Sequence, residues 1–134
     1  GSFGGVDLQA GGTLGFNNGN NGADDYMGYN LGAIVGFSGF RVAGSYWHDD
    51  DAPAGDTTGI TAGAAATLGP VDLSVTYASI IDADNNQEGD NLVISGTMGL
   101  LPGLSLHGDV AFFDRDTGGN DDRVTGVVRL RVAF

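Results

Sequence analysis

The sequence predicts an all-β fold in which eight antiparallel strands, connected up and down, close into a transmembrane β-barrel. Three observations predict it. Residues alternate between an uncharged face and a polar face, most regularly in Arg123 to Phe134, and a period of two is typical of a strand. Long polar breaks alternate with short turns, as outer loops and periplasmic turns do in such barrels. No apolar run reaches the roughly 18 residues that a membrane-spanning helix needs.

The composition limits the classes of function. The chain has 134 residues, which suits a single domain over residues 1–134. Its net charge is −12, from 17 acidic residues against 5 basic ones, all arginine. We expect no binding to nucleic acid, because so few cations cannot neutralise a run of phosphates. Cysteine is absent, so neither a disulfide nor a thiolate metal site can form. We expect no dedicated metal site and no other cofactor.

Turn and loop residues divide the chain into segments of about ten residues, long enough to cross a bilayer as tilted strands. Short turns are expected at Ser38-Gly39, Gly69-Pro70 and Leu101-Pro102-Gly103. Longer acidic breaks are expected over residues 17–25, 48–58, 81–90 and 114–122, as four outer loops. The predicted strands cover residues 5–16, 26–37, 40–48, 59–68, 71–80, 91–100, 104–113 and 123–134.

Each predicted strand has one uncharged face and one polar face. The polar face lacks the lysines and glutamates that cover the solvent face of most soluble proteins. It carries small polar residues and three aspartates against three arginines, which suits a crowded or water-lined interior where charges must pair. The candidate lumen-lining residues are Asp7, Gln9, Asn30, Arg41, Asp72, His107, Asp109, Arg129 and Arg131.

The last predicted strand is expected to close the barrel by pairing with the first, so that no strand edge remains in lipid. That pairing would bring Asp7 close to Arg129 or Arg131. Two interpretations of the inward arginines stay open and do not exclude each other. The arginines form ion pairs that fill the lumen, or they form a basic ladder that guides anions, since lumen residues set selectivity in such barrels.

The aromatic residues sort by strand end. Such a distribution resembles the two aromatic girdles that lie at the membrane interfaces of a barrel. The residues near the long-loop ends are Tyr26, Tyr46, Tyr77 and Phe112, and those near the short-turn ends are Phe37, Phe40 and Phe134.

Two patterns resemble chemical sites. Ser105, His107 and Asp109 share a face, but residues two apart on a strand are about 6.6–6.8 Å apart along its axis. Because a nucleophile and its base must lie within about 3.2 Å, we interpret the three as a polar stripe and expect no enzyme. The acidic segment 82–90 alternates oxygen ligands as calcium loops do, but it lacks the sixth-position glycine and the terminal glutamate of an EF-hand. The segment 114–122 is a second oxygen-rich loop, and we expect weak divalent binding at the surface at most.

Four segments resemble the C-terminal half of Gram-negative outer-membrane general porins. They are GYNLGAIVGFSGFRVAGSYW (28–47), ATLGPVDLSVTYA (66–78), GLLPGLSLHGDVAFFDRDTGGNDD (99–122) and RVTGVVRLRVAF (123–134). The resemblance implies a barrel in the bacterial outer membrane, in contact with lipid and lipopolysaccharide, through which small hydrophilic solutes or ions diffuse passively. It also implies that Phe134 is part of the signal that the outer-membrane assembly machinery recognises.

The chain departs from that family in size. Porins have 16–18 strands, whereas eight are predicted here, and no loop is long enough to fold into a pore as a constriction. The chain is therefore either half of a porin or a small barrel with a porin-like sequence. A wide pore would need a longer parent or a homo-oligomer in which two chains complete one barrel.

Two other classes of barrel remain as alternatives. One is a small, closed, eight-stranded structural or surface-binding barrel without significant conductance. The other is a soluble barrel that binds a ligand inside, in which the apolar faces would point inward.

Overall fold

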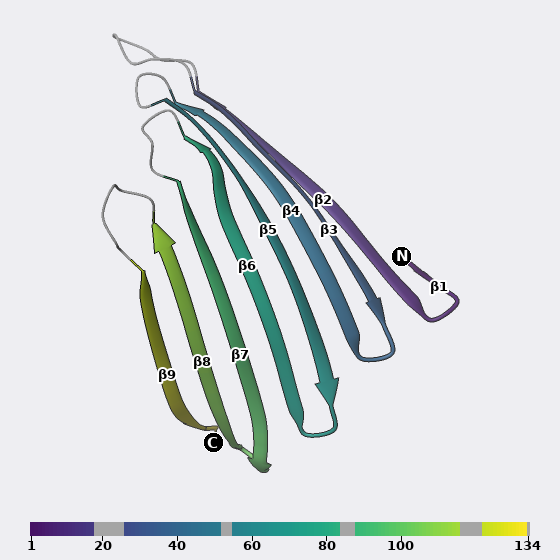
Figure 1. Ribbon diagram of the computed structural model, residues 1–134. Helices are drawn as coiled ribbons and strands as arrows, with labels where there is room; N and C mark the ends of the chain where they lie inside the picture. Colours follow the sequence, from purple (N-terminus) through teal and green to yellow (C-terminus); the bar gives the residue numbers. More distant parts are fainter. Residues whose placement is uncertain (18–25, 52–54, 84–87, 116–121, 134) are drawn as a thin grey trace.

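The computed structural model describes residues 1–17, 26–51, 55–83, 88–115 and 122–133. In these ranges nine strands pair into one antiparallel sheet whose spatial order is the order of the chain (Figure 1). No helix in them is long and apolar enough to cross a membrane. The predicted all-β, antiparallel, up-and-down architecture is therefore confirmed. The strands are β1 (Ser2–Phe3), β2 (Val6–Asn17), β3 (Tyr26–Phe37), β4 (Phe40–Asp51), β5 (Gly55–Leu68), β6 (Val71–Ala83), β7 (Gly89–Leu101), β8 (Leu104–Arg115) and β9 (Arg123–Val132).

Tight turns join β3 to β4, β5 to β6 and β7 to β8, all at one end of the sheet, called here the turn end (Figure 1). Ser38 and Gly39 both have positive φ, 47° and 83°, as a two-residue type I′ hairpin requires. Gly69 precedes Pro70 with φ 63° and Gly103 follows Pro102 with φ 77°, and glycine adopts such angles without strain. The three predicted short turns are thus confirmed. The opposite end is called the loop end.

The predicted count of eight strands is wrong for the described residues, which contain nine. The additional strand is the two-residue β1, which pairs with the start of β2 through Ser2 and Asp7. Gly4 and Gly5, with φ of 59° and 81°, make the turn between them. The N-terminal amine also donates a hydrogen bond of 2.7 Å to the carbonyl of Leu8. Because this hairpin is so short, its period-two pattern could not be distinguished from a loop.

Several strands extend further into the acidic breaks than predicted. The break expected over 48–58 is mostly strand, because β4 continues to Asp51 and β5 begins at Gly55. His48 lies opposite Thr58, and Asp50 lies opposite Asp56. Ladder hydrogen bonds therefore continue through polar residues that resemble a loop by composition alone.

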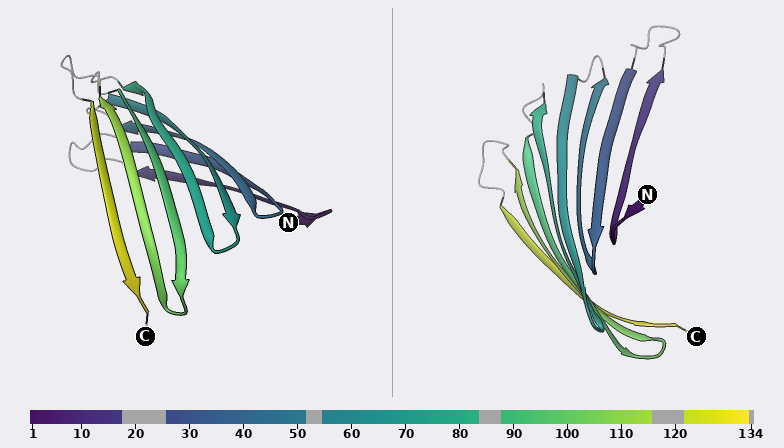
Figure 2. Two further views of the ribbon diagram at one scale, coloured as in Figure 1. Left: turned by 60° about the horizontal axis from the view of Figure 1, so that its bottom comes forward. Right: turned by 90° about the vertical axis from the view of Figure 1, so that its right-hand side faces the viewer.

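The predicted closure between the first and last strands is not found in the described residues, where the sheet is open. β9 pairs with β8 on one side only, and β1 and β2 form the other edge. Two further views show a twisted, curved sheet with these edges far apart (Figure 2). β2 and β9 run in opposite directions along the sheet, so strand direction permits closure, but the curvature of these strands does not bring the edges together.

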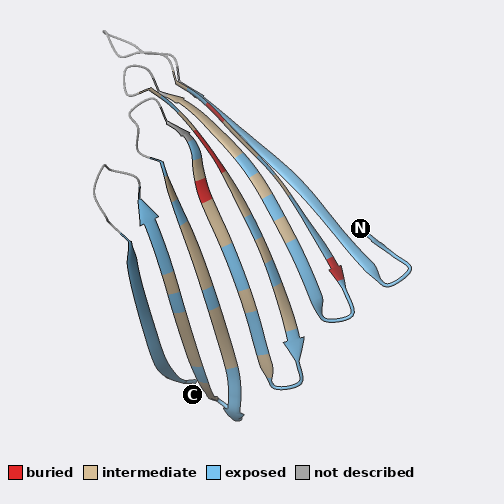
Figure 3. Ribbon diagram, in the orientation of Figure 1, coloured by how far each residue is buried: buried red, intermediate tan, exposed pale blue. Residues whose placement is uncertain are grey.

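The sheet is a single layer without a core. No side chain in the described part of the chain is fully buried, and exposed positions run along the whole of β9 (Figure 3). Large apolar side chains such as Leu14, Val42 and Val128 are 66%, 61% and 77% exposed. Soluble proteins rarely expose so much contiguous apolar surface, which marks a surface that contacts another molecule or a membrane.

Candidate functional site: the polar face of the sheet

Cross-strand register collects the polar residues of all the long strands on one side of the sheet, called here the polar face. One register row starts at Asp7 on β2 and passes through Arg41 on β4 to Asp109 on β8. Side chains alternate sides along a strand, so residues two positions away along each strand share this face. The opposite side, called the apolar face, carries residues such as Leu8, Val42 and Ile94, which are 53%, 61% and 48% exposed.

All nine predicted lumen-lining residues lie on the polar face by this register and alternation. So do all five arginines of the chain, including Arg115 and Arg123, which stand opposite Gly89 and Phe113. Among the described residues, one ion pair is found between predicted lumen-lining residues, at 4.0 Å between Arg129 Nη2 and Asp109 Oδ2. The nine residues are Asp7, Gln9, Asn30, Arg41, Asp72, His107, Asp109, Arg129 and Arg131.

His107 is the centre of a hydrogen-bonded group at the turn end of the polar face. Its Nδ1 lies 3.0 Å from the Thr97 hydroxyl and its Nε2 lies 2.9 Å from the Ser105 hydroxyl. The side chains thus close the gap between Ser105 and His107 that their backbone spacing leaves open. Asp109 turns instead to Arg129, so Ser105, His107 and Asp109 do not form the chain of contacts that a catalytic triad needs.

The expected approach of Asp7 to Arg129 or Arg131 is wrong for the described residues, because these strands form opposite edges. Asp7 instead accepts a hydrogen bond from the Ser2 hydroxyl. It lies in the row of Gly36 and Arg41, and a Cβ built at Gly36 would stand 3.4 Å from Arg41 Cγ and 3.7 Å from Asp7 Cβ. Both distances are ordinary van der Waals contacts, so the side chains of Arg41 and Asp7 flank the Gly36 backbone from the two neighbouring strands.

A hollow of about 660 Å³ opens on the polar face over β2 to β6 and is called here the central hollow. Its walls carry uncharged side chains and several glycines. At Gly32 a Cβ would lie 3.3 Å from both Gly44 O and Ser45 Cβ, so the absence of side chains at such positions deepens the hollow. Its polar residues are Gln9, Thr13, Asn30, Ser45, Thr61 and Thr76.

A second, smaller hollow of about 270 Å³ lies nearer the turn end and does include charged residues. Arg41 and Asp72 both line it. Asp72 accepts a hydrogen bond of 2.7 Å from the Thr67 hydroxyl. The charged hollow and the central hollow are thus separate regions of one wall.

Trp47 lies on the polar face although it was not among the predicted lumen-lining residues. A Cβ at Gly59, which lies directly across the strand pair from it, would collide with the indole ring, so the ring lies over the Gly59 backbone. Trp47 also borders a hollow of about 540 Å³ at the loop end, together with Asn91, Phe113 and Arg115. Trp47 and Arg41 are an even number of positions apart on β4, and residues so spaced share a face of the sheet. The alternation in the sequence could therefore have predicted the face on which Trp47 lies.

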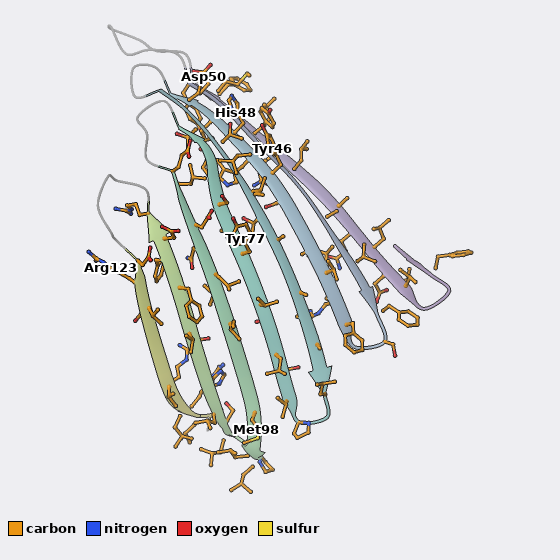
Figure 4. The ribbon with its side chains drawn as sticks, viewed as in Figure 1. Tyr46, His48, Asp50, Tyr77, Met98 and Arg123 are labelled. Atoms are coloured by element: carbon orange, nitrogen blue, oxygen red, sulfur yellow. The ribbon has the colours of Figure 1, made fainter. Side chains whose placement is uncertain are left out.

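The apolar face carries an aromatic band toward the loop end. The rings of Tyr29 and Tyr46 are 6.0 Å apart and those of Tyr29 and His48 are 5.4 Å apart. Tyr46, His48 and Asp50 follow one another toward the loop end of β4 (Figure 4). The Tyr77 hydroxyl donates a 2.9 Å hydrogen bond to Asp90.

One aromatic residue was wrongly assigned to this band. Tyr26 lies on the polar face, where its hydroxyl donates a 2.9 Å hydrogen bond to Asp49. The two residues are on neighbouring strands, and a Cβ at Gly28 would collide with both side chains. Its nearness to a strand end suggested the girdle, whereas its phase along β3 places it on the other side of the sheet.

Some predicted features lie outside the described residues. Phe134, the proposed assembly signal, is one of them, as are the central residues of the acidic segments 82–90 and 114–122. Within the described ranges, no group of three or more histidine, aspartate or glutamate side chains could hold a metal ion.

A family model described as "Gram-negative porin" matches residues 1–118 of the chain. No curated protein matches the chain.

Proposed function

The chain belongs to the Gram-negative porin family, and from that premise we propose that it forms an outer-membrane channel for passive diffusion of small hydrophilic solutes or ions. The single observation that carries the proposal is the division of the sheet into two faces. One face exposes large apolar side chains along its whole width. The other holds every arginine of the chain and hollows whose linings include polar side chains.

This division is what a barrel wall in lipid requires. Lipid offers no hydrogen bonds, so a spanning strand must direct apolar side chains outward and pair its backbone groups with neighbouring strands. Charged side chains are then placed toward the lumen, where water and opposite charges stabilise them. The tyrosines toward the loop end of the apolar face fit the interfacial region, where lipopolysaccharide head groups would contact them.

The two edges of the sheet need partners before it can lie in a bilayer: β9 on one side, and on the other the part of β2 that β1 leaves unpaired. We propose that the sheet closes there into a barrel. Eight long strands closing on themselves would enclose little more than their own side chains, while 16 to 18 leave an aqueous channel. Two copies in a homo-oligomer, or further strands of a longer chain, would supply the larger barrel, and because β2 and β9 run in opposite directions an even number of added strands keeps every pair antiparallel.

The test is conductance in planar lipid bilayers. Protein refolded by the outer-membrane assembly machinery or in detergent is expected to give discrete channel events in KCl. The mass of the folded species in detergent, measured in parallel, separates one eight-strand unit from a larger barrel. Folded protein that inserts into the bilayer and gives no channel events would contradict the proposal.

A second candidate is a small closed barrel that has a structural or surface-binding role. The paired side chains at the turn end favour it, because Thr97, His107 and Ser105 satisfy one another as groups in a filled interior do. This candidate predicts a monomer in detergent together with no conductance. A larger mass with conductance would exclude it.

A further inference from the structure

The polar side chains of the central hollow differ from the other polar groups of the same face in their hydrogen bonding. At the turn end, Thr97 and Ser105 are bonded to His107, and Thr67 is bonded to Asp72. In the described part of the chain, by contrast, none of the six polar residues of the hollow forms a side-chain hydrogen bond. Their donors and acceptors are available to whatever occupies the hollow.

The hollow is also the uncharged part of the wall. The register row that starts at Gln9 and ends at Thr125 on β9 contains no charged residue in any strand. Charged rows flank the central hollow on both sides. The row of Arg41 lies toward the turn end, and the row of Asp49 lies toward the loop end. A charged solute in the hollow would lose hydration without meeting a counter-charge.

We propose that the central hollow is a subsite for neutral, polyhydroxylated solutes of the sugar class, an inference that rests on the channel function proposed above. Hydroxyl and carboxamide groups both donate and accept hydrogen bonds, as the hydroxyl groups of a sugar do. Side chains such as Asn30, Thr61 and Thr76 can therefore either donate a hydrogen bond to a sugar hydroxyl or accept one from it. The volume of about 660 Å³ lies within the range of about 300–1,000 Å³ that is usual for small-molecule sites.

Trp47 makes the proposal measurable. It pairs with Asn30 in the register and stands one row toward the loop end from Ser45 and Thr61, at the rim of the hollow. It is the only tryptophan in the chain. The apolar C–H face of a sugar ring packs on aromatic rings, so we expect the emission of Trp47 to change when a sugar occupies the hollow.

The experiment compares two double variants of the whole chain. Thr61→Val with Thr76→Val removes two hydroxyls from the hollow while keeping the side-chain shape. Thr57→Val with Thr125→Val makes the same chemical change on the same face outside it. Sucrose is titrated against Trp47 fluorescence in detergent micelles and against KCl conductance in bilayers, and sodium gluconate is the charged probe of similar chemistry.

We expect the half-saturating sucrose concentration to rise about tenfold in the first variant, as the loss of two hydrogen bonds predicts, and to change less than twofold in the control. Gluconate should bind more weakly than sucrose. A salt-conducting channel in which sucrose changes neither current nor fluorescence would overturn the subsite and leave the channel function intact. If no channel forms, the micelle titration alone decides: an equal effect of both variants, or equal binding of gluconate, rejects the subsite.

Discussion

The apolar face and the polar face are built from alternating residues of the same strands, yet their side chains are stabilised in different ways. On the apolar face, exposed side chains such as Leu14 and Val128 have no protein layer to cover them and depend on the surrounding medium. On the polar face, groups such as His107 and Asp72 find partners on neighbouring strands. The stability of the apolar face therefore depends on what lies outside the sheet, whereas that of the polar face depends on cross-strand register.

The largest expected effect comes from placing the same charge on each face. Val93 and Ile94 are adjacent β-branched residues near the middle of β7, on the polar and apolar faces respectively. Ile94→Lys should destabilise the folded protein in liposomes by about 2–4 kcal/mol, the cost of a lysine facing lipid at mid-depth. Val93→Lys should cost far less, because its charge faces the polar side. Urea titration of folding into liposomes measures both, and equal losses would refute the assignment of the faces.

The next largest effect is expected from replacing a glycine by alanine on each face. In Gly59→Ala the new Cβ would collide with the Trp47 indole and displace the ring from its position over residue 59. Overpacking of this kind costs about 1–3 kcal/mol of stability. Gly126, on the apolar face, would place its new Cβ 3.6 Å from Asp109 O, which is ordinary contact, so Gly126→Ala should be neutral or stabilise the strand by up to about 1 kcal/mol. Unfolding free energies and the Trp47 emission maximum test the pair. An unchanged emission maximum in Gly59→Ala would show that the indole does not lie over residue 59.

Charge removal on the polar face should change ion selectivity with little change in stability. Arg131→Gln removes an exposed cation, and the neighbouring Leu130→Val changes only the apolar face. We expect the ratio of K⁺ to Cl⁻ permeability to rise about twofold in the arginine variant, because lumen charges set selectivity, and to stay constant in the leucine variant. Zero-current potentials in a KCl gradient measure this ratio. A constant potential in Arg131→Gln would place that side chain outside the conducting path.

The smallest effect concerns the group around His107. Thr97→Val removes the hydroxyl that contacts His107 Nδ1 and should cost about 0.5–1.5 kcal/mol, the net value of one such hydrogen bond. Thr125→Val, on the edge strand, removes a hydroxyl for which no side-chain hydrogen bond is found in the described residues and should change stability by no more than about 0.5 kcal/mol. Urea unfolding compares them, and equal costs would mean that the Thr97 contact does not contribute.

Local pattern was sufficient for much of the fold. The tight turns follow from glycine, proline and serine at Ser38-Gly39, Gly69-Pro70 and Pro102-Gly103, and the resulting hairpins were predicted within a few residues. The membership of the porin family was also predicted from the repeated hairpin pattern, and the match over residues 1–118 confirms it. Errors arose where nearness to a strand end was used in place of phase, as for Tyr26. They also arose where polar composition indicated a loop but the residues continue a strand, as at His48 to Asp51.

The sequence by itself determined which residues share a face, because alternation is a property of a single strand and repeats every two residues. Only the tertiary structure decided which residues meet across strands. Trp47 lies over Gly59, His107 lies between Thr97 and Ser105, and β9 lies far from β2. Such neighbours depend on register and curvature, which accumulate over every turn and bulge of the sheet, so no single segment of the chain encodes them.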